Sequence, residues 1–200
     1  MTEATTASTT DPATPTLADW VARAQALRPR SRPFIDGAFV APRDGSVVVD
    51  VTPRDGTPIA EVETAGAGDV DLAVAAARAA FEDGRWADRT PLERKRVLLR
   101  FADLVRANAD ELALLESLDV GHPIGDATAV DVPGAANCLQ WYAEAADKQY
   151  GEVGPTGPGA LSLVTREPLG VVAALVPWNY PLIITAWKLG RPSPRATLSS

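Results

Sequence analysis

The feature that most constrains the fold is an uninterrupted apolar run, GVVAALV (Gly170–Val176), which ends at the sequence PWNYP. A strand with one face in water alternates apolar and polar residues. This run is apolar throughout, which is the pattern of a strand covered on both faces in a parallel sheet. PLIITAWKL then begins at Pro181, and proline at the first helical position predicts a helix start. Asn179 therefore lies in a strand-to-helix turn, at the sheet edge where ligands bind in open α/β folds.

Asn179 has two interpretations from its position alone. Asparagine is a preferred N-cap residue, so its side chain can simply close the first turn of the following helix. Its amide NH2 can also act as a neutral donor to an oxyanion that forms during a reaction, and losing such a donor lowers turnover by ~10²–10³-fold. The spacing of the residues does not decide between the two.

The composition excludes several classes of protein. A formal net charge of -7 is opposite to the clustered positive charge of surfaces that bind nucleic acid or anionic membranes. One cysteine and one histidine allow no internal disulfide and no zinc-ligand cluster, so we expect no metal. No apolar run approaches the ~18 residues of a membrane span. The start contains an acid and no apolar core, so we expect a disordered tail (1–16), no signal peptide and a cytoplasmic protein.

Ahead of the apolar run, the patterns predict a small antiparallel β-meander and then a layer of helices. Asp-Gly pairs at 36–37, 44–45 and 55–56 mark turns between β-rich runs. The helix 90–108 has the clearest start, because TPLE places a capping box and an N1 proline together. The other expected elements are helices 17–27, 68–84, 108–121 (capped by Asn108, with Glu111 three residues later) and 132–150, and a half-exposed strand 161–165.

The residues around Asn179 resemble the signature of the aldehyde dehydrogenase superfamily, in which Glu-Pro-x-Gly-Val leads through Pro-Trp-Asn-aromatic-Pro-Leu into a Trp-Lys-Leu helix. Upstream segments agree in family order: FIDGAFV, DVDLAVAAARAAFEDGRW, KRVLLRFADLVRANADELALLESLDVGHPI and YAEAADKQYGE. The resemblance covers roughly Pro33 to Gly190. The stretch DVPGAANCLQWYAEAADKQYGEV is most similar to the branch acting on aminoaldehydes, such as gamma-glutamyl-gamma-aminobutyraldehyde or betaine aldehyde.

For the fold, the resemblance implies an α/β protein of which this chain is the amino-terminal part, an incomplete domain. Residues 17–190 would form that part of the aldehyde dehydrogenase domain. Within it, 160–166 would be an oligomerisation-type arm strand. Residues 170–190 would be the first strand, turn and helix of the parallel, dinucleotide-binding sheet.

For the chemistry, the resemblance implies NAD(P)+-dependent oxidation of an aldehyde to a carboxylic acid via a cysteine thiohemiacetal. Asn179 matches the catalytic asparagine that, with a backbone N–H at the nucleophilic cysteine, holds the oxyanion. Val176, Pro177, Trp178 and Asn179 match the turn that contacts NAD or NADP. The implied partners are a small-molecule aldehyde and further copies of the chain, as a homo-oligomer (dimer or tetramer), with no nucleic acid and no membrane.

The other chemically suggestive side chains have structural interpretations. Cys138 lies inside the expected helix 132–150 with no turn to present it, so it packs as a small hydrophobe and is not the nucleophile. His122 stands where the family usually has lysine, and we expect a loop residue without a catalytic role. The remaining expectations are a structural salt bridge for Glu167, an exposed helix face for Lys188, and core positions for Trp187, Trp141 and Tyr142.

The last ten residues, RPSPRATLSS (191–200), depart from the family, which continues with a segment like Pro-Ala-Leu-Ala-Thr-Gly-Asn-Thr-Val-Val. We expect no strand there. One encoding of these residues, read one base earlier, translates as that family segment. We therefore hypothesise that a lost base in a C-rich run made 191–200 an out-of-frame tail. The chain would then lack the nucleophile, expose its apolar strand and be inactive alone.

Two alternatives to a shifted reading frame remain open. One is a non-enzymatic fragment that docks onto full-length family subunits by strand addition. The other is a sequencing error in the gene of a full-length enzyme. An in-frame open reading frame directly downstream would favour a broken enzyme gene, and an intact paralogue that co-purifies with the chain would favour docking. Codons for 191–200 that cannot yield the family segment contradict the shifted frame.

Overall fold

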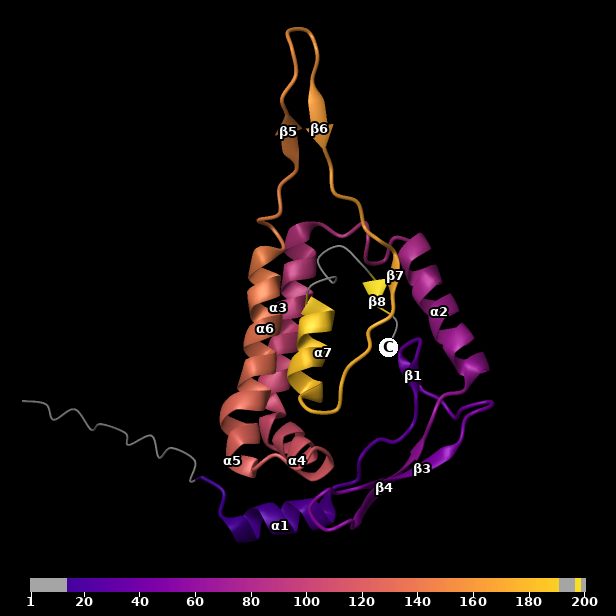
Figure 1. The fold of residues 1–200 in the computed structure, drawn as a ribbon, viewed down its shortest axis with the longest axis vertical. Coiled ribbons are helices and arrows are strands. Elements are labelled where there is room, and N and C mark those ends of the chain that lie inside the picture. The colour runs from indigo at the N-terminus through magenta and orange to yellow at the C-terminus, as the bar shows by residue number, and fades with distance from the viewer. Residues whose placement is uncertain (1–13, 191–196, 199–200) are drawn as a thin grey trace, which may run out of the picture.

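The computed structural model describes residues 14–190 and 197–198, as a layer of helices with small hairpins at its edges (Figure 1). The helices are α1 (Leu17–Ala26), α2 (Ala67–Glu82), α3 (Pro91–Ala107), α4 (Ala109–Asp119), α5 (Ile124–Asp126), the π-helical segment η1 (Ala127–Asp131), α6 (Val132–Ala145) and α7 (Pro181–Gly190). The strands are β1 (Phe34–Ile35), β2 (Ala38–Phe39), β3 (Val47–Val51), β4 (Pro58–Glu63), β5 (Glu152–Gly154), β6 (Ser162–Val164), β7 (Val171–Val172) and β8 (Thr197–Leu198).

Helix starts follow local capping chemistry. The predicted capping box of α3 is confirmed: Thr90 Oγ1 accepts from the Glu93 N–H at 3.3 Å, and the Glu93 carboxylate accepts from the Thr90 N–H at 2.8 Å. Thr16 and Asp19 form a second box at α1, which begins at Leu17 as predicted, directly after the segment expected as a tail. Asn108 is the N-cap residue of α4, as predicted, but its side chain makes no capping hydrogen bond. Asn108 instead donates from Nδ2 to the Leu104 carbonyl at 2.8 Å, because α4 continues almost directly from α3.

The core lies where α6 packs against α3 and α7 (Figure 1). Most of its buried side chains are alanines, which let the helix axes approach closely. The members are Ala102, Val105, Ala113, Ala127, Val132, Ala135, Ala136, Leu139 and Ala186.

The helix expected at 132–150 differs from the observed one at both ends. Helical backbone runs continuously from α5 through η1 into α6, and α6 ends at Ala145. The inward packing expected of two tryptophans is wrong, since Trp141 is 63% exposed and Trp187 52% exposed. Tyr142 is partly buried and meets Trp141 edge to face. Small side chains fill the α6 interface, so the bulky rings lie at its rim.

The amino-terminal strands form two separate antiparallel hairpins, β1–β2 and β3–β4, instead of one meander. The Asp36-Gly37 turn is confirmed, with both residues at positive φ. Asp44-Gly45 does not join paired strands. The Asp44 carboxylate accepts from the Gly68 N–H at 2.9 Å, so this residue ties the loop to the start of α2. A third hairpin, β5–β6, projects away from the helices (Figure 1).

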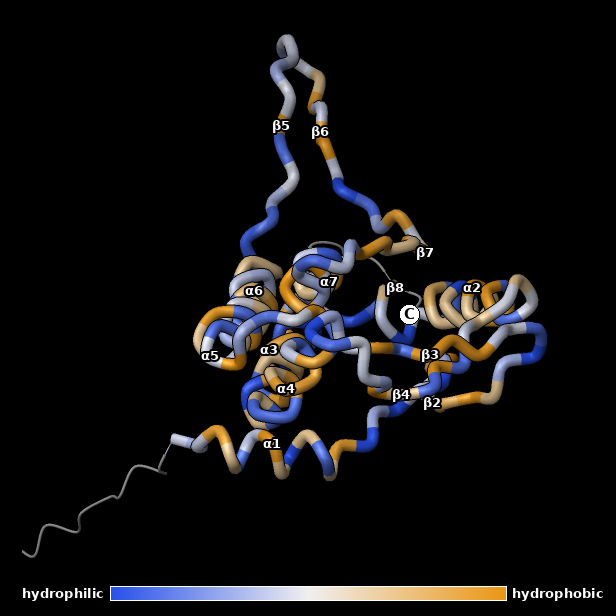
Figure 2. The backbone as a smooth tube through the Cα atoms, turned by 60° about the horizontal axis from the view of Figure 1, so that its bottom comes forward, coloured by the Kyte–Doolittle hydropathy of each residue, from blue (hydrophilic) through white to orange (hydrophobic). Residues whose placement is uncertain are grey.

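The apolar run 170–176 contributes only Val171 and Val172 to a strand, β7, which pairs in parallel with β8. The expected lack of strand character is therefore wrong for Thr197 and Leu198. The predicted exposure is confirmed for the carboxyl end of the run, where residues 173–176 are exposed and Leu175 is 84% exposed. It is not confirmed for the strand itself, since Val171 and Val172 are half-buried, although the chain at β7 carries the hydrophobic colour of Figure 2. The expectations for a disordered tail and for an out-of-frame tail fall mainly on residues 1–13, 191–196 and 199–200, outside those described, and stay predictions.

Gly190 tests the α6–α7 interface. A Cβ at this position would collide with the Tyr142 ring, whereas a Cβ at the helical residue Gly125 would meet nothing within 4 Å. We expect Gly190→Ala to lower the free energy of unfolding by about 1–3 kcal/mol, the usual penalty of overpacking. The matched control Gly125→Ala should be neutral or slightly stabilising. Urea unfolding at constant m-value measures both free energies, and equal stability of the two variants would contradict the close packing of Gly190 on Tyr142.

Candidate functional site

Asn179 lies in the turn between β7 and α7. The helix begins at Pro181, and the Ile184 N–H donates to the Tyr180 carbonyl at 3.0 Å, so Tyr180 occupies the N-cap position. The Asn179 side chain is exposed and hydrogen-bonds to none of the described residues. The helix-capping interpretation of Asn179 therefore has no hydrogen bond to support it, and its amide NH2 is available to a ligand.

Exposed apolar side chains surround this amide. Trp178 is 87% exposed, and Leu175, Val176 and Tyr180 are also exposed. Contiguous exposed apolar surface of this kind marks a binding or packing site in a soluble protein. The turn therefore presents one polar donor, which has no hydrogen bond to a described residue, beside exposed apolar side chains.

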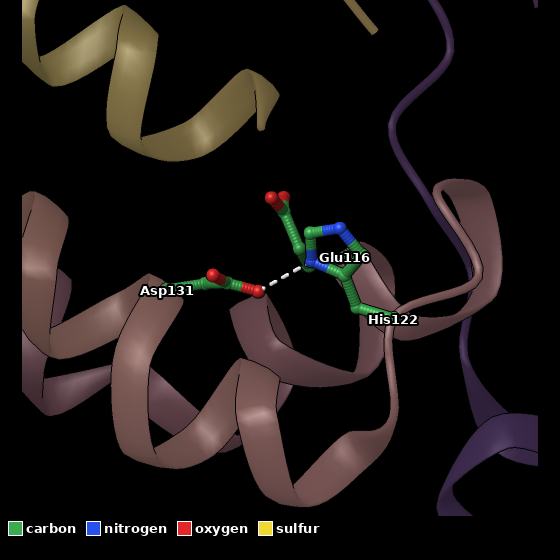
Figure 3. Close-up of side chains that lie close together, drawn as sticks. All are labelled: Glu116, His122 and Asp131. Atoms are coloured by element: carbon green, nitrogen blue, oxygen red, sulfur yellow. Dashed lines mark hydrogen bonds and ion pairs between the residues drawn. The ribbon is translucent and has the colours of Figure 1, made fainter. Parts of the chain in front are cut away.

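Three titratable side chains lie close together near the start of α7 (Figure 3). Glu116 comes from α4, His122 from the loop before α5, and Asp131 from the last residue of η1. His122 Nδ1 lies 2.7 Å from Asp131 Oδ2. Asp131 is 1% exposed and Glu116 is 6% exposed. We call these three residues the acid–histidine cluster.

The cluster contacts the turn at Tyr180 and the start of α7 at Leu182. The His122 ring packs on the Tyr180 ring, with centroids 4.8 Å apart and planes inclined by 58°. The backbone N–H of Leu182, in the first turn of α7, interacts with the Glu116 carboxylate. Burial raises the pKa of Glu116, and the negative charge of Asp131 raises it further. Glu116 Oε1 has no hydrogen-bond partner among the described residues.

The cluster was missed by sequence reasoning, which treated His122 as a lone loop residue. His122 does lie in a loop, but it has a carboxylate partner. The signal was present in two acids inside apolar segments, Glu116 in LALLESL and Asp131 in TAVDVPG, where buried helix faces are expected. Each cluster residue offers one metal-ligand atom, all within 4.8 Å of one another. Counting cysteines and histidines alone does not exclude such a site, so the expectation of no metal stays a prediction.

Cys138, Lys188 and Glu167 are not part of the acid–histidine cluster. Cys138 is partly buried against the helical core, and burial raises the pKa of its thiol, which confirms a packing role. Lys188 is exposed on α7, as predicted. The salt bridge predicted for Glu167 is wrong within the described part of the chain. Its neighbour Arg166 instead pairs with Glu152 at 3.5 Å across the β5–β6 hairpin. No helix among the described residues is long and apolar enough to cross a membrane.

Known proteins match this chain over most of its length. The NADP/NAD-dependent aldehyde dehydrogenase PuuC of Escherichia coli is 47% identical over 174 residues, which are 87% of this chain and 35% of PuuC. The aminoacetaldehyde dehydrogenase of Pseudomonas aeruginosa is 46% identical, over 86% of this chain and 35% of its own. The chain thus spans about a third of the length of these curated relatives.

The fold is shared as well. The gamma-glutamyl-gamma-aminobutyraldehyde dehydrogenase of Burkholderia cenocepacia matches with a TM-score of 0.86 and 52% identity, over 92% of this chain and 38% of that one. The sequence model described as the aldehyde dehydrogenase family matches residues 39–192, well over half of the chain. The turn that carries Asn179 lies inside this matched region, and the chain belongs to the aldehyde dehydrogenase family.

Proposed function

We propose that this chain contributes the amino-terminal part of an enzyme that oxidises an aldehyde to a carboxylic acid with NAD+ or NADP+. The observation that carries the proposal is the Asn179 amide, which is exposed and has no hydrogen bond to a described residue, in the turn between β7 and α7 of a family member. The nucleophilic cysteine and the glutamate base are assigned to sequence outside these 200 residues. The chain alone is therefore expected to be inactive.

Asn179 is the catalytic residue that we assign within the chain. When a cysteine thiolate adds to an aldehyde, the carbonyl oxygen becomes an oxyanion. A neutral NH2 donor stabilises this oxygen by hydrogen bonding and cannot protonate it. Because the Asn179 amide makes no hydrogen bond to a described residue, no such bond must break before it binds the oxyanion.

Val176, Pro177 and Trp178 are proposed to contact the cofactor together with Asn179. When bound, a nicotinamide cofactor supplies a hydride acceptor. The turn fits a flat nicotinamide ring, because Trp178 and Val176 expose apolar surface beside the carboxyl end of β7. A structure of the indole-3-acetaldehyde dehydrogenase AldA of P. syringae, 48% identical with a TM-score of 0.89 over 92% of this chain and 38% of that one, is a complex with NAD+.

The proposed substrate class is aminoaldehydes, since two relatives are named as aminoacetaldehyde and gamma-glutamyl-gamma-aminobutyraldehyde dehydrogenases. We further infer a cytoplasmic homo-oligomer that binds neither nucleic acid nor membranes. The net charge of -7 supports the absence of nucleic-acid and anionic-membrane binding. The single cysteine, which allows no internal disulfide, is compatible with a reducing compartment.

The function is tested in a chimera that continues residues 1–190 with the carboxy-terminal two thirds of E. coli PuuC. We expect NAD(P)+-dependent oxidation of aminoaldehydes by this chimera. Asn179→Ala should lower kcat by ~10²–10³-fold with little change in KM, because the lost hydrogen bond forms only as the oxyanion develops. Asn137→Ala, an asparagine of α6 bonded to Arg106, is the matched control. An Asn179→Ala chimera with unchanged kcat would contradict the assigned role.

A second candidate function is non-enzymatic docking onto full-length family subunits. The projecting β5–β6 hairpin favours it, since Val153 and Leu163 are exposed and each strand pairs only with the other among the described residues (Figure 1). We expect the chain to form a mixed oligomer when co-expressed with a full-length family enzyme, observed by native mass spectrometry. Leu163→Pro should abolish it, because proline lacks a backbone N–H and disrupts the pairing of a strand interior. Separate species in the wild-type experiment would exclude docking.

A further inference from the structure

The acid–histidine cluster is built from residues brought together by the fold. Its members come from a helix, a loop and the η1–α6 junction, and two are almost fully buried. Buried carboxylates are retained at a free-energy cost unless they are paired. Asp131 is paired with His122, and the Ser117 hydroxyl donates to the His122 carbonyl at 2.7 Å. His122 is therefore held through both its ring and its backbone carbonyl.

The held imidazole faces the functional turn. Its ring contacts Tyr180, the residue directly after Asn179, while the Glu116 carboxylate interacts with the N–H of Leu182, three residues after Asn179. The cluster thus contacts both Tyr180 and the first turn of α7. Asn179 is exposed and has no hydrogen bond of its own to a described residue, so its position depends on these neighbours.

A divalent cation is the competing use of the same three side chains. Their ligand atoms lie within 4.8 Å of one another, and Glu116 Oε1 has no partner among the described residues. Two observations favour direct contacts. The Asp131–His122 pair already lies at 2.7 Å, and the Glu116 carboxylate already faces a backbone N–H. The metal is therefore kept as an outcome of the test.

We propose that His122 is a positioning residue: oriented by Asp131 and assisted by Glu116, it holds Tyr180 and thereby fixes the Asn179 amide in the turn. The catalytic meaning of this contact rests on the proposed function of Asn179. An oxyanion donor works only at hydrogen-bond distance, and a displacement of about 1 Å lowers turnover by ~10²-fold. In the PuuC chimera, His122→Ala should therefore lower kcat by ~10²-fold with little change in KM.

Glu116 provides a pH-dependent check on the electrostatics of the cluster. Asp131 of η1 and Asp119 of α4 raise the pKa of Glu116, and His122 and the Leu182 N–H lower it, with burial the largest cause. Because its folded pKa is raised, Glu116 contributes stability below its unfolded pKa and loses it as pH rises through the folded pKa. Glutamine cannot ionise, so the Tm of Glu116→Gln relative to the wild type should increase as the pH rises from about 4 to about 8, a range that brackets the ordinary pKa of Glu. A Tm difference that decreases as the pH rises would contradict the inference that ionised Glu116 destabilises the fold.

The positioning role is tested by NMR on the whole 200-residue chain. Asparagine occurs at positions 108, 137 and 179, so selective ¹⁵N-asparagine labelling reports on Asn179 with two internal references. We expect a backbone order parameter of about 0.85 at Asn179, falling below about 0.6 in His122→Ala and Asp131→Ala while the references stay rigid. Asp131→Asn should keep the rigid value, because its side-chain carbonyl still accepts from the imidazole.

Two further variants make the outcome decisive. Tyr180→Ala removes the ring that His122 contacts without altering a buried charge, so it should mobilise Asn179 as strongly as His122→Ala. Thr128→Ala removes hydrogen bonds to Ile124 and Gly125 on the helical segment that carries Asp131, and should leave Asn179 rigid. Unchanged order at Asn179 in Tyr180→Ala, or equal loss at all three asparagines in His122→Ala and Asp131→Ala, would overturn the proposal.

Zn²⁺ titrated into the wild-type chain tests the metal. His122 is the one histidine of the chain, so its ring signals are unambiguous. Saturable one-to-one binding that shifts these signals would contradict the proposal that the three side chains contact one another directly without a metal. No such binding is expected. Failure of the proposed function gives a different result. If Asn179 becomes mobile in His122→Ala but the Asn179→Ala chimera keeps its kcat, then His122 does position Asn179, and Asn179 has no catalytic role.

Discussion

The close approach of α6 and α7 is the constraint on which the rest of the structure depends. Alanines line the buried face of α6, and a glycine from each helix meets a side chain of the other. A Cβ on Gly134 would press against Ile183, and one on Gly190 would collide with Tyr142. Because small residues fix α7 on α6 at both ends, they also fix Pro181, where the helix begins.

Buried carboxylates show how differently the fold treats structural and functional charge. Asp69 is 1% exposed and accepts from the N–H groups of Arg43 and Gly66, which hold the pKa of its carboxyl below the usual range. Glu116 is similarly buried, yet one of its oxygens has no partner among the described residues and its pKa is raised. Asp69 ties a loop to a helix start with its charge satisfied. Glu116 stabilises the fold poorly as an ion, which is the pattern expected where a position serves a site.

Local signals in the sequence predicted most helices and the place of the turn. The capping box at Thr90 and the proline at 181 act over three or four residues, so tertiary contacts do not override them. Asn108 occupies the predicted N-cap position of α4, but its side chain bonds to the end of α3 instead of capping, because the two helices are nearly continuous. Trp141 and Trp187 were mispredicted because hydrophobicity does not tell which apolar side chains fit a narrow, alanine-lined interface. The acid–histidine cluster joins residues up to fifteen positions apart through the packing of α4 against η1. The apolar segments around Glu116 and Asp131 predict that these acids are buried, but no local pattern predicts that they meet.

A donor that is to bind an oxyanion cannot also be held by a hydrogen bond within the protein, so its place must be fixed by its neighbours. Pro177 and Pro181 restrict the backbone on both sides of Asn179, and the residues before them, Val176 and Tyr180, are restricted toward extended conformations. Those restrictions set the shape of the turn but do not attach it to the body of the protein. The Tyr180 ring, packed on His122, supplies an attachment, because it reaches the buried charge of Asp131 while leaving the Asn179 amide free.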